Sequence, residues 1–99
     1  MYMLYPYRVL KHNLVNGTIE LSYHTILRDA YRACLPDNKT HRCHLMLNGL
    51  EQKLKNGEDL IRVTCYPKVN YWIESLIGKA EPVPIPELAS KIECCHPIE

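Results

Sequence analysis

Cysteine and histidine are the residue types in this chain best suited to chemistry, and there are five of each. Cys43 and His44 are adjacent, Cys34 precedes them, and Cys95 lies near the end of the sequence. Thiolates and imidazoles are the ligands that zinc prefers, so one hypothesis is a tetrahedral zinc site built from these four residues. The spacing contains no Cys-x2-Cys pair and no His-x3-His pair. The competing interpretation is therefore a set of scattered thiols and surface histidines, with no metal and no cofactor.

Cys43 is also the best candidate for a nucleophile. A reactive thiol needs a nearby base or a helix N-terminus to favour the thiolate. Cys43 lies between Arg42 and His44 and falls in the first turn of a helix expected over 41–55. No recognisable motif supplies a residue to orient the base, so we expect Cys43 to pack and the protein not to be an enzyme. Phosphate-binding glycine loops and His-Glu-x2-His are also missing from the sequence.

Nucleic-acid binding is a further alternative, because helices expected over 23–34 and 41–55 follow each other as in a helix-turn-helix, although their connection contains Pro36 and is longer than the usual tight turn. A recognition helix presents basic and amide side chains, and 41–55 offers several. The chain has 12 basic and 11 acidic side chains and a net charge of +1. A nucleic-acid-binding surface normally carries a clustered basic excess. We therefore do not expect direct binding to DNA or RNA, and keep a small zinc-stabilised or helix-based nucleic-acid module as the alternative.

Prolines beside aromatic residues favour binding to a partner protein. Tyr66-Pro67 follows a predicted strand, and a prolyl bond after an aromatic residue is a candidate for the cis state, which suggests a prolyl isomerase as a partner. Residues 80–86 alternate with proline and favour an extended polyproline segment that loses little entropy on docking. Because Tyr and Trp dominate interface energies, the predicted anchors are Tyr66, Pro67, Tyr71, Trp72, Pro84 and Ile85.

The elements that position these residues begin with a β-hairpin. Asn16-Gly17 separates two runs that contain apolar residues, which predicts strands over 7–15 and 18–22 joined by a type I′ turn. A third strand is expected over 60–66, where Ile61, Val63 and Cys65 alternate with polar residues.

Helical spacing of apolar residues predicts helices over 23–34, 41–55 and 71–77, the last built on Trp72, Ile73, Leu76 and Ile77. Asn56-Gly57 is expected to end the second helix as a left-handed cap. The predicted fold is α+β: a small three-stranded, mainly antiparallel sheet with three helices on one face. A proline-rich segment and a short helix over 87–94 follow. Residues 1–79 and 80–99 are expected to form one domain.

Composition supports a single folded domain. Apolar residues make up 46% of the 99 residues and charged residues 23%, which is typical of globular proteins. The sequence has neither a run of about 20 apolar residues nor the basic, apolar start of a secretory signal. We therefore expect a cytoplasmic protein that does not bind a membrane, with its cysteines reduced.

The short, nearly uncharged chain without an enzyme motif resembles the accessory proteins of temperate phages. It is similar in size to the anti-RecBCD proteins of P22-like phages, and Tyr66-Pro67 fits that resemblance. The resemblance implies a non-enzymatic inhibitor or modulator of a host enzyme complex such as the recombination nuclease RecBCD, acting in the host cytoplasm. It implies no catalytic residues.

Overall fold

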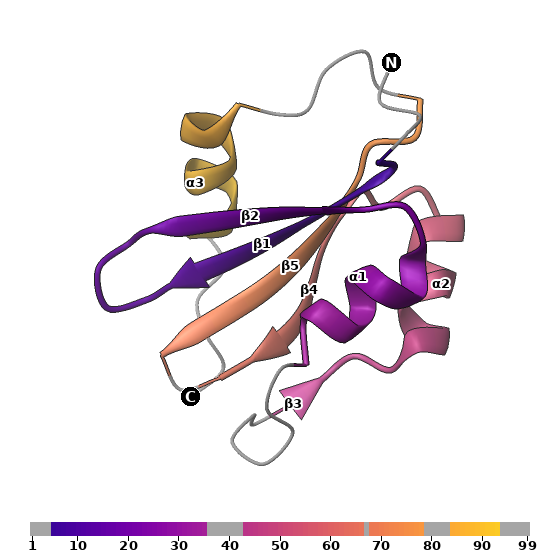
Figure 1. The fold of residues 1–99 in the computed structure, drawn as a ribbon, viewed down its shortest axis with the longest axis horizontal. Helices are drawn as coiled ribbons and strands as arrows, with labels where there is room; N and C mark the ends of the chain where they lie inside the picture. The colour runs from indigo at the N-terminus through magenta and orange to yellow at the C-terminus, as the bar shows by residue number, and fades with distance from the viewer. Residues whose placement is uncertain (1–4, 36–42, 67, 79–83, 94–99) are drawn as a thin grey trace.

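The described residues form a sheet of five strands in the order β2-β1-β5-β4-β3, in which every neighbouring pair is antiparallel (Figure 1). The computed structural model describes residues 5–35, 43–66, 68–78 and 84–93. The elements within them are β1 (Tyr7–Asn13), β2 (Ile19–His24), α1 (Leu27–Ala33), β3 (Cys43–His44), α2 (Leu47–Lys55), β4 (Leu60–Cys65), β5 (Val69–Ser75) and α3 (Ile85–Glu93). The predicted α+β class is confirmed, and the predicted number of strands is wrong.

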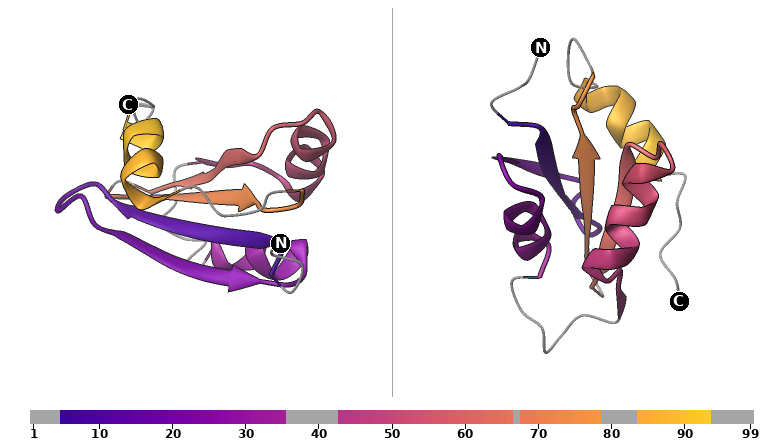
Figure 2. Two further views of the ribbon diagram at one scale, coloured as in Figure 1. Left: turned by 90° about the horizontal axis from the view of Figure 1, so that it is seen from above. Right: turned by 90° about the vertical axis from the view of Figure 1, so that its right-hand side faces the viewer.

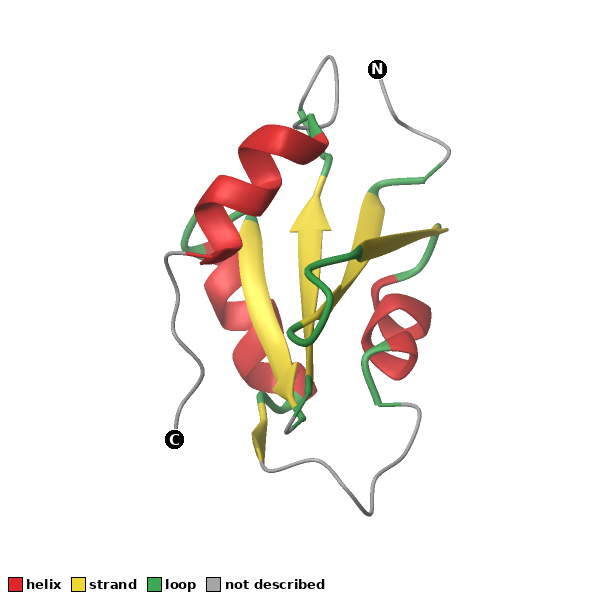
Figure 3. Ribbon diagram, turned by 90° about the vertical axis from the view of Figure 1, so that its left-hand side faces the viewer, coloured by secondary structure: helices red, strands yellow, loops and turns green. Residues whose placement is uncertain are grey.

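The helices cover both faces of the sheet. α1 and α2 lie together at one side of the molecule and α3 lies at the other (Figure 1); Figure 3 looks from the α3 side. Ala30 of α1 and Leu50 of α2 join one core cluster, whereas Leu88 of α3 joins a second cluster with Leu10 and Trp72. The expectation that all helices share one face is therefore wrong, because the central strands carry apolar side chains on both faces.

The largest correction concerns residues 71–77, which were expected to be a helix. They fall mostly in β5, which pairs with β1 on one side and β4 on the other. Tyr71 and Ile73 point toward α1 and α2, while Trp72 points toward α3. A strand buried on both faces is a continuous apolar run, so periodicity cannot distinguish it from a buried helix.

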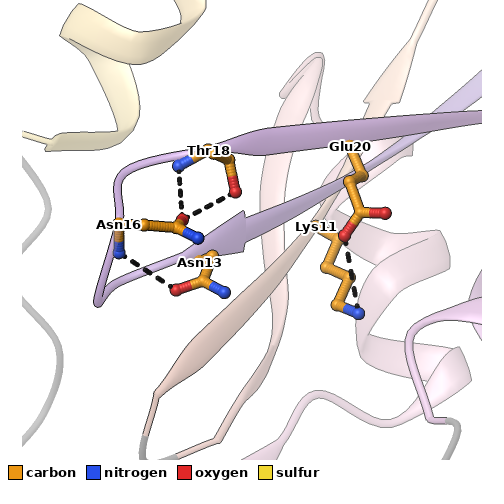
Figure 4. A network of polar contacts seen from close by, with 5 residues as sticks. All are labelled: Lys11, Asn13, Asn16, Thr18 and Glu20. Atoms are coloured by element: carbon orange, nitrogen blue, oxygen red, sulfur yellow. Dashed lines mark hydrogen bonds and ion pairs between the residues drawn. The ribbon is translucent and has the colours of Figure 1, made fainter.

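The first hairpin forms where it was predicted, but with a longer loop. β1 ends at Asn13, and Asn13 N–H donates to the Thr18 carbonyl at 2.9 Å. The Asn13 side-chain oxygen accepts from the amide of Val15 and from that of Asn16, and Figure 4 shows the second of these bonds. Gly17 has a φ of +75°, and no other residue of the loop has a positive φ. The type I′ turn is therefore wrong, because that turn needs a positive φ at both central positions.

The two helices on the same face are shorter than expected. The predicted 23–34 helix is α1, and its first residues continue β2 instead. The predicted 41–55 helix begins at Leu47, because Cys43–His44 pair with β4 as the short strand β3. Its end is as predicted: Gly57 has a φ of +92°, and Glu58 N–H donates to the Lys53 carbonyl at 3.1 Å, which is the Schellman arrangement.

The proline-rich segment lies largely outside the described residues, which resume at Pro84. The C-terminal helix predicted over 87–94 is α3, which starts earlier and includes Ile85 and Pro86. Proline suits the first turn of a helix because its missing N–H has no partner there. Within the described part of the chain, no helix is long and apolar enough to cross a membrane.

Candidate functional site

The three aromatic anchors inferred from the sequence lie in the core. Tyr66, Tyr71 and Trp72 are 9%, 7% and 4% exposed. The rings of Tyr66 and Tyr71 meet edge to face, with centroids 5.7 Å apart. Tyr71 and Trp72 lie in the central strand β5, and Tyr66 directly follows β4. All three side chains pack in the core clusters between the sheet and the helices and do not present a surface to a partner. Their assignment as surface anchors is therefore corrected.

The remaining predicted anchors lie at the surface or outside the described residues. Pro84 and Ile85 are exposed at the start of α3, with Ile85 38% exposed. Pro67 lies outside the described residues. Its neighbour Lys68 is exposed between β4 and β5. Docking through Pro84 and Ile85 stays a prediction.

The cysteines are divided between buried and undescribed positions. Cys34 is fully buried, and its Sγ donates to the Ala30 carbonyl at 3.4 Å. Burial raises the pKa of Cys34 to about 12, so its thiol stays protonated near neutral pH. Cys65 is buried in β4 opposite Cys43 of β3.

The expected helical setting of Cys43 is wrong. Cys43 lies in β3, and α2 begins only at Leu47. Cys43 is therefore not in the first turn of a helix, which was the setting expected to favour its thiolate. The side chains of Cys43 and His44, and all of Cys95, lie outside the description, so the zinc hypothesis stays untested. The described residues contain no group of three or more metal-ligating side chains.

The shifted thiol predicts a dependence of stability on pH. The folded-state pKa of Cys34 is about 12, against an ordinary value of 9.0. The stabilisation from the protonated thiol is therefore complete below about pH 9 and is lost as the pH rises toward 12. We expect the urea midpoint to fall more steeply above pH 9 in the wild type than in Cys34→Ala, which removes this titration. Parallel curves for the two proteins would contradict the buried thiol.

Among the described residues, a surface hollow lies between α1 and α2. It is a hollow of about 380 Å³ lined by Ile26, Leu27, Arg28, Asp29, Arg32, Leu47 and Glu51. We refer to these seven residues as the α1–α2 groove. In the right-hand view of Figure 2, α1 and α2 stand on either side of β5, which is visible between them. The spacing of apolar residues in the sequence predicts two amphipathic helices, but it does not show that they lie next to each other. The groove between them is therefore apparent only in the tertiary structure.

The helix spacing explains the composition of the α1–α2 groove. Ala30 and Cys34, four residues apart, point into the core, so Arg28 and Arg32 point outward from α1. Ile26 lies four residues before Ala30, but it precedes the helix with an extended backbone and so does not follow the helical stripe, and it is 58% exposed. The feature of the sequence that could have indicated an exposed Ile26 is its apolar side chain just before the helix, at a position where polar residues are preferred.

The charges around the groove balance. Arg28 and Arg32 carry positive charge, Asp29 and Glu51 carry negative charge, and all four are exposed. Ile26, Leu27 and Leu47 provide the apolar part. An apolar centre with a charged rim is the usual composition of a protein–protein interface. The α1–α2 groove is thus suited to an apolar side chain flanked by charges of both signs.

Comparison with known proteins identifies no relative: no family model, no curated protein and no solved structure matches this chain.

Proposed function

We propose that this protein is a non-enzymatic binding protein that inhibits or modulates a host enzyme complex, and that the α1–α2 groove contacts the partner. The observation that carries the proposal is Ile26, which is 58% exposed and lines the groove together with two leucines and four charged side chains. A large aliphatic side chain that is exposed in the free protein gains free energy by transfer into a partner's apolar pocket.

The resemblance to phage accessory proteins suggests which partner to test first. It favours a recombination nuclease of the RecBCD type in the host cytoplasm. The mixed charges of the groove fit a protein surface better than a nucleic-acid backbone, which would favour a basic patch. A prolyl isomerase stays a second predicted partner on the basis of Tyr66-Pro67.

The test uses the unusual position of Ile26. Its backbone is extended, with φ −116° and ψ 134°, and it caps α1 without a side-chain hydrogen bond. Asp is among the preferred N-cap residues, so Ile26→Asp should fold at least as well as the wild type. In contact with a partner, the same change buries a carboxylate in place of an aliphatic chain. We expect affinity for the nuclease complex to fall at least about tenfold.

The matched control is Val15→Asp. Val15 is 74% exposed in the β1–β2 loop, so this variant adds the same charge at an exposed apolar position outside the groove. Binding to the purified nuclease complex and inhibition of its activity on DNA would be measured for all three proteins. Equal binding by the two variants would rule out the groove as the contact surface. Absence of binding by the wild type would rule out this nuclease as the partner. Turnover of a substrate by the isolated protein would contradict a non-enzymatic role.

A further inference from the structure

The outer edge of β2 is long and lacks most of the features that usually protect a sheet edge. β2 is the first strand in the sheet order, and no described strand pairs with its outer side. Its six residues, Ile19–His24, include no proline, glycine or lysine. The pairing with β1 is continuous, without a bulge. The opposite edge is β3, which has two residues. Proteins guard edges by short strands, charged side chains (lysine especially), proline or bulges, and of these β2 has only the charge of Glu20.

The hydrogen-bonding pattern identifies the main-chain groups at this edge. Because Asn13 N–H donates to the Thr18 carbonyl, Asn13 and Thr18 form a hydrogen-bonded pair. Antiparallel pairing alternates, so Glu20, Ser22 and His24 also turn their main-chain groups toward β1. Ile19, Leu21 and Tyr23 therefore turn theirs outward. A new strand must pair with these odd-numbered residues.

From this edge we infer that β2 binds β2 of a second copy of the chain, in an antiparallel arrangement centred on Ser22. A two-fold axis makes two identical edges antiparallel and self-complementary. Pairing centred on Ser22 places Leu21 opposite Tyr23 of the second copy, and both residues have outward main-chain groups. Each of the two symmetry-related Leu21–Tyr23 pairs then exchanges two main-chain hydrogen bonds.

Charge selects this register. Centred on Ser22, the arrangement places Glu20 opposite His24 of the second copy, twice by symmetry. Two other registers that the outward groups allow are centred on Glu20 and on Leu21. The first places Glu20 opposite Glu20 of the second copy. The second places Glu20 opposite Ser22 and leaves the glutamate without an opposite basic residue. Glu20 has a side chain 69% exposed and an ion pair to Lys11 at 3.6 Å (Figure 4), while His24 contacts the exposed Ser22 hydroxyl at 2.8 Å. Both side chains are thus accessible from the edge.

The side of β2 that faces α3 provides apolar contacts for the proposed dimer. Tyr23 is 43% exposed, and its ring meets that of Tyr5, 50% exposed, with centroids 6.3 Å apart. Leu21 is half-buried against the cluster of Leu10 and Trp72. Pairing Leu21 with Tyr23 extends this cluster across the seam, and aromatic–aliphatic pairs across strands are stabilising. The edge of β2 is separate from the α1–α2 groove. The dimer proposed here and the partner binding proposed for the groove can therefore be tested independently.

A charge-swap experiment tests the register. Glu20→Lys places lysine opposite His24 of the second copy, and His24→Glu places glutamate opposite Glu20. Like charges opposite each other are destabilising, and each clash occurs twice, so each variant alone should dimerise about tenfold more weakly than the wild type in sedimentation equilibrium. Mixing the two variants pairs Lys at 20 with Glu at 24, so the mixture should associate again as a heterodimer.

The matched control is Glu58→Lys. Glu58 forms an exposed ion pair with Lys53 at 3.6 Å, the same length as Lys11–Glu20, outside β2. This variant should dimerise like the wild type. A wild type that stays monomeric up to about 1 mM, where binding is worth only about 4 kcal/mol, overturns the proposal. Failure of the mixed variants to associate, when the wild type does, overturns the register.

Amide hydrogen exchange provides a readout specific to the edge. The amides of Leu21 and Tyr23 should become protected as protein concentration rises, while those of Glu20 and Ser22 stay protected at every concentration. Tyr23→Pro removes an outward donor without removing a bond to β1, and proline is tolerated at such edge positions. Tyr23→Thr keeps the donor and loses the ring. Dimerisation lost in Tyr23→Pro and weakened less in Tyr23→Thr supports main-chain pairing; equal effects contradict it.

Discussion

Trp72→Ala is expected to remove a large part of the stability of the domain. The indole is 4% exposed in a central strand and packs with Leu10, Leu88 and Ile92. Truncating a buried tryptophan to alanine costs about 3–5 kcal/mol, whereas a small domain has about 5–15 kcal/mol of total stability. We expect the far-UV circular dichroism of Trp72→Ala to lose its sharp thermal transition, or the urea midpoint to fall to a small fraction of the wild-type value.

Trp72→Phe is the informative companion variant. The indole Nε1 is buried, and in the described part of the chain it has no hydrogen-bond partner. Phenylalanine keeps much of the packed area and removes that unpartnered donor, so its loss of stability should be clearly smaller than that of alanine. A folded Trp72→Ala with an unchanged midpoint would show that the residue is not part of the core, and would reopen its assignment as a surface anchor.

Removing either partner of the buried Arg8–Glu74 pair should be nearly as damaging. The two residues are 3% and 0% exposed, lie opposite each other on β1 and β5, and are joined by a hydrogen bond of 2.7 Å from Arg8 Nε to Glu74 Oε1. Breaking such a pair leaves a buried charge without its counter-ion and costs about 3–5 kcal/mol. Arg8→Met and Glu74→Leu should each lower the free energy of unfolding by that order.

The double variant measures the interaction between Arg8 and Glu74 separately from the interactions of each residue with the rest of the protein. Replacing a buried ion pair by apolar residues of similar volume is often neutral. Arg8→Met with Glu74→Leu should therefore be more stable than either single variant, and urea unfolding of the four proteins gives the coupling between the two sites. Additive losses in the double variant would show that the two charges are stabilised independently of each other.

Local signals in the sequence account for the elements with one exposed face or a marked end. The hairpin loop is marked by Asn16-Gly17, and Gly17 does adopt a positive φ. β4 alternates in the sequence and is a strand over Leu60–Cys65. α2 ends where Asn56-Gly57 predicts. In each case the interaction that determines the element lies within a few residues along the chain, so the local sequence is enough to predict it.

The elements that were missed depend on neighbours distant in sequence. Val69–Ser75 is a strand because β1 and β4 hydrogen-bond to it from both sides, and neither partner is visible in its own residues. β3 exists because β4 offers pairing to Cys43 and His44. The aromatic anchors failed for the same reason: Tyr and Trp suit both cores and interfaces, and burial in a central strand decided between them.

The sequence by itself determined an α+β domain, its first hairpin, the last strand before Tyr66 and the glycine that ends α2, because those features depend on backbone preferences and short-range periodicity. Tertiary structure alone decided which apolar residues are covered and which remain exposed. It buried Trp72, left Ile26 exposed between two helices, and placed β2 at the edge with outward main-chain groups. Exposure is a property of the packed layers, so the surfaces on which function depends appear only once the chain has folded.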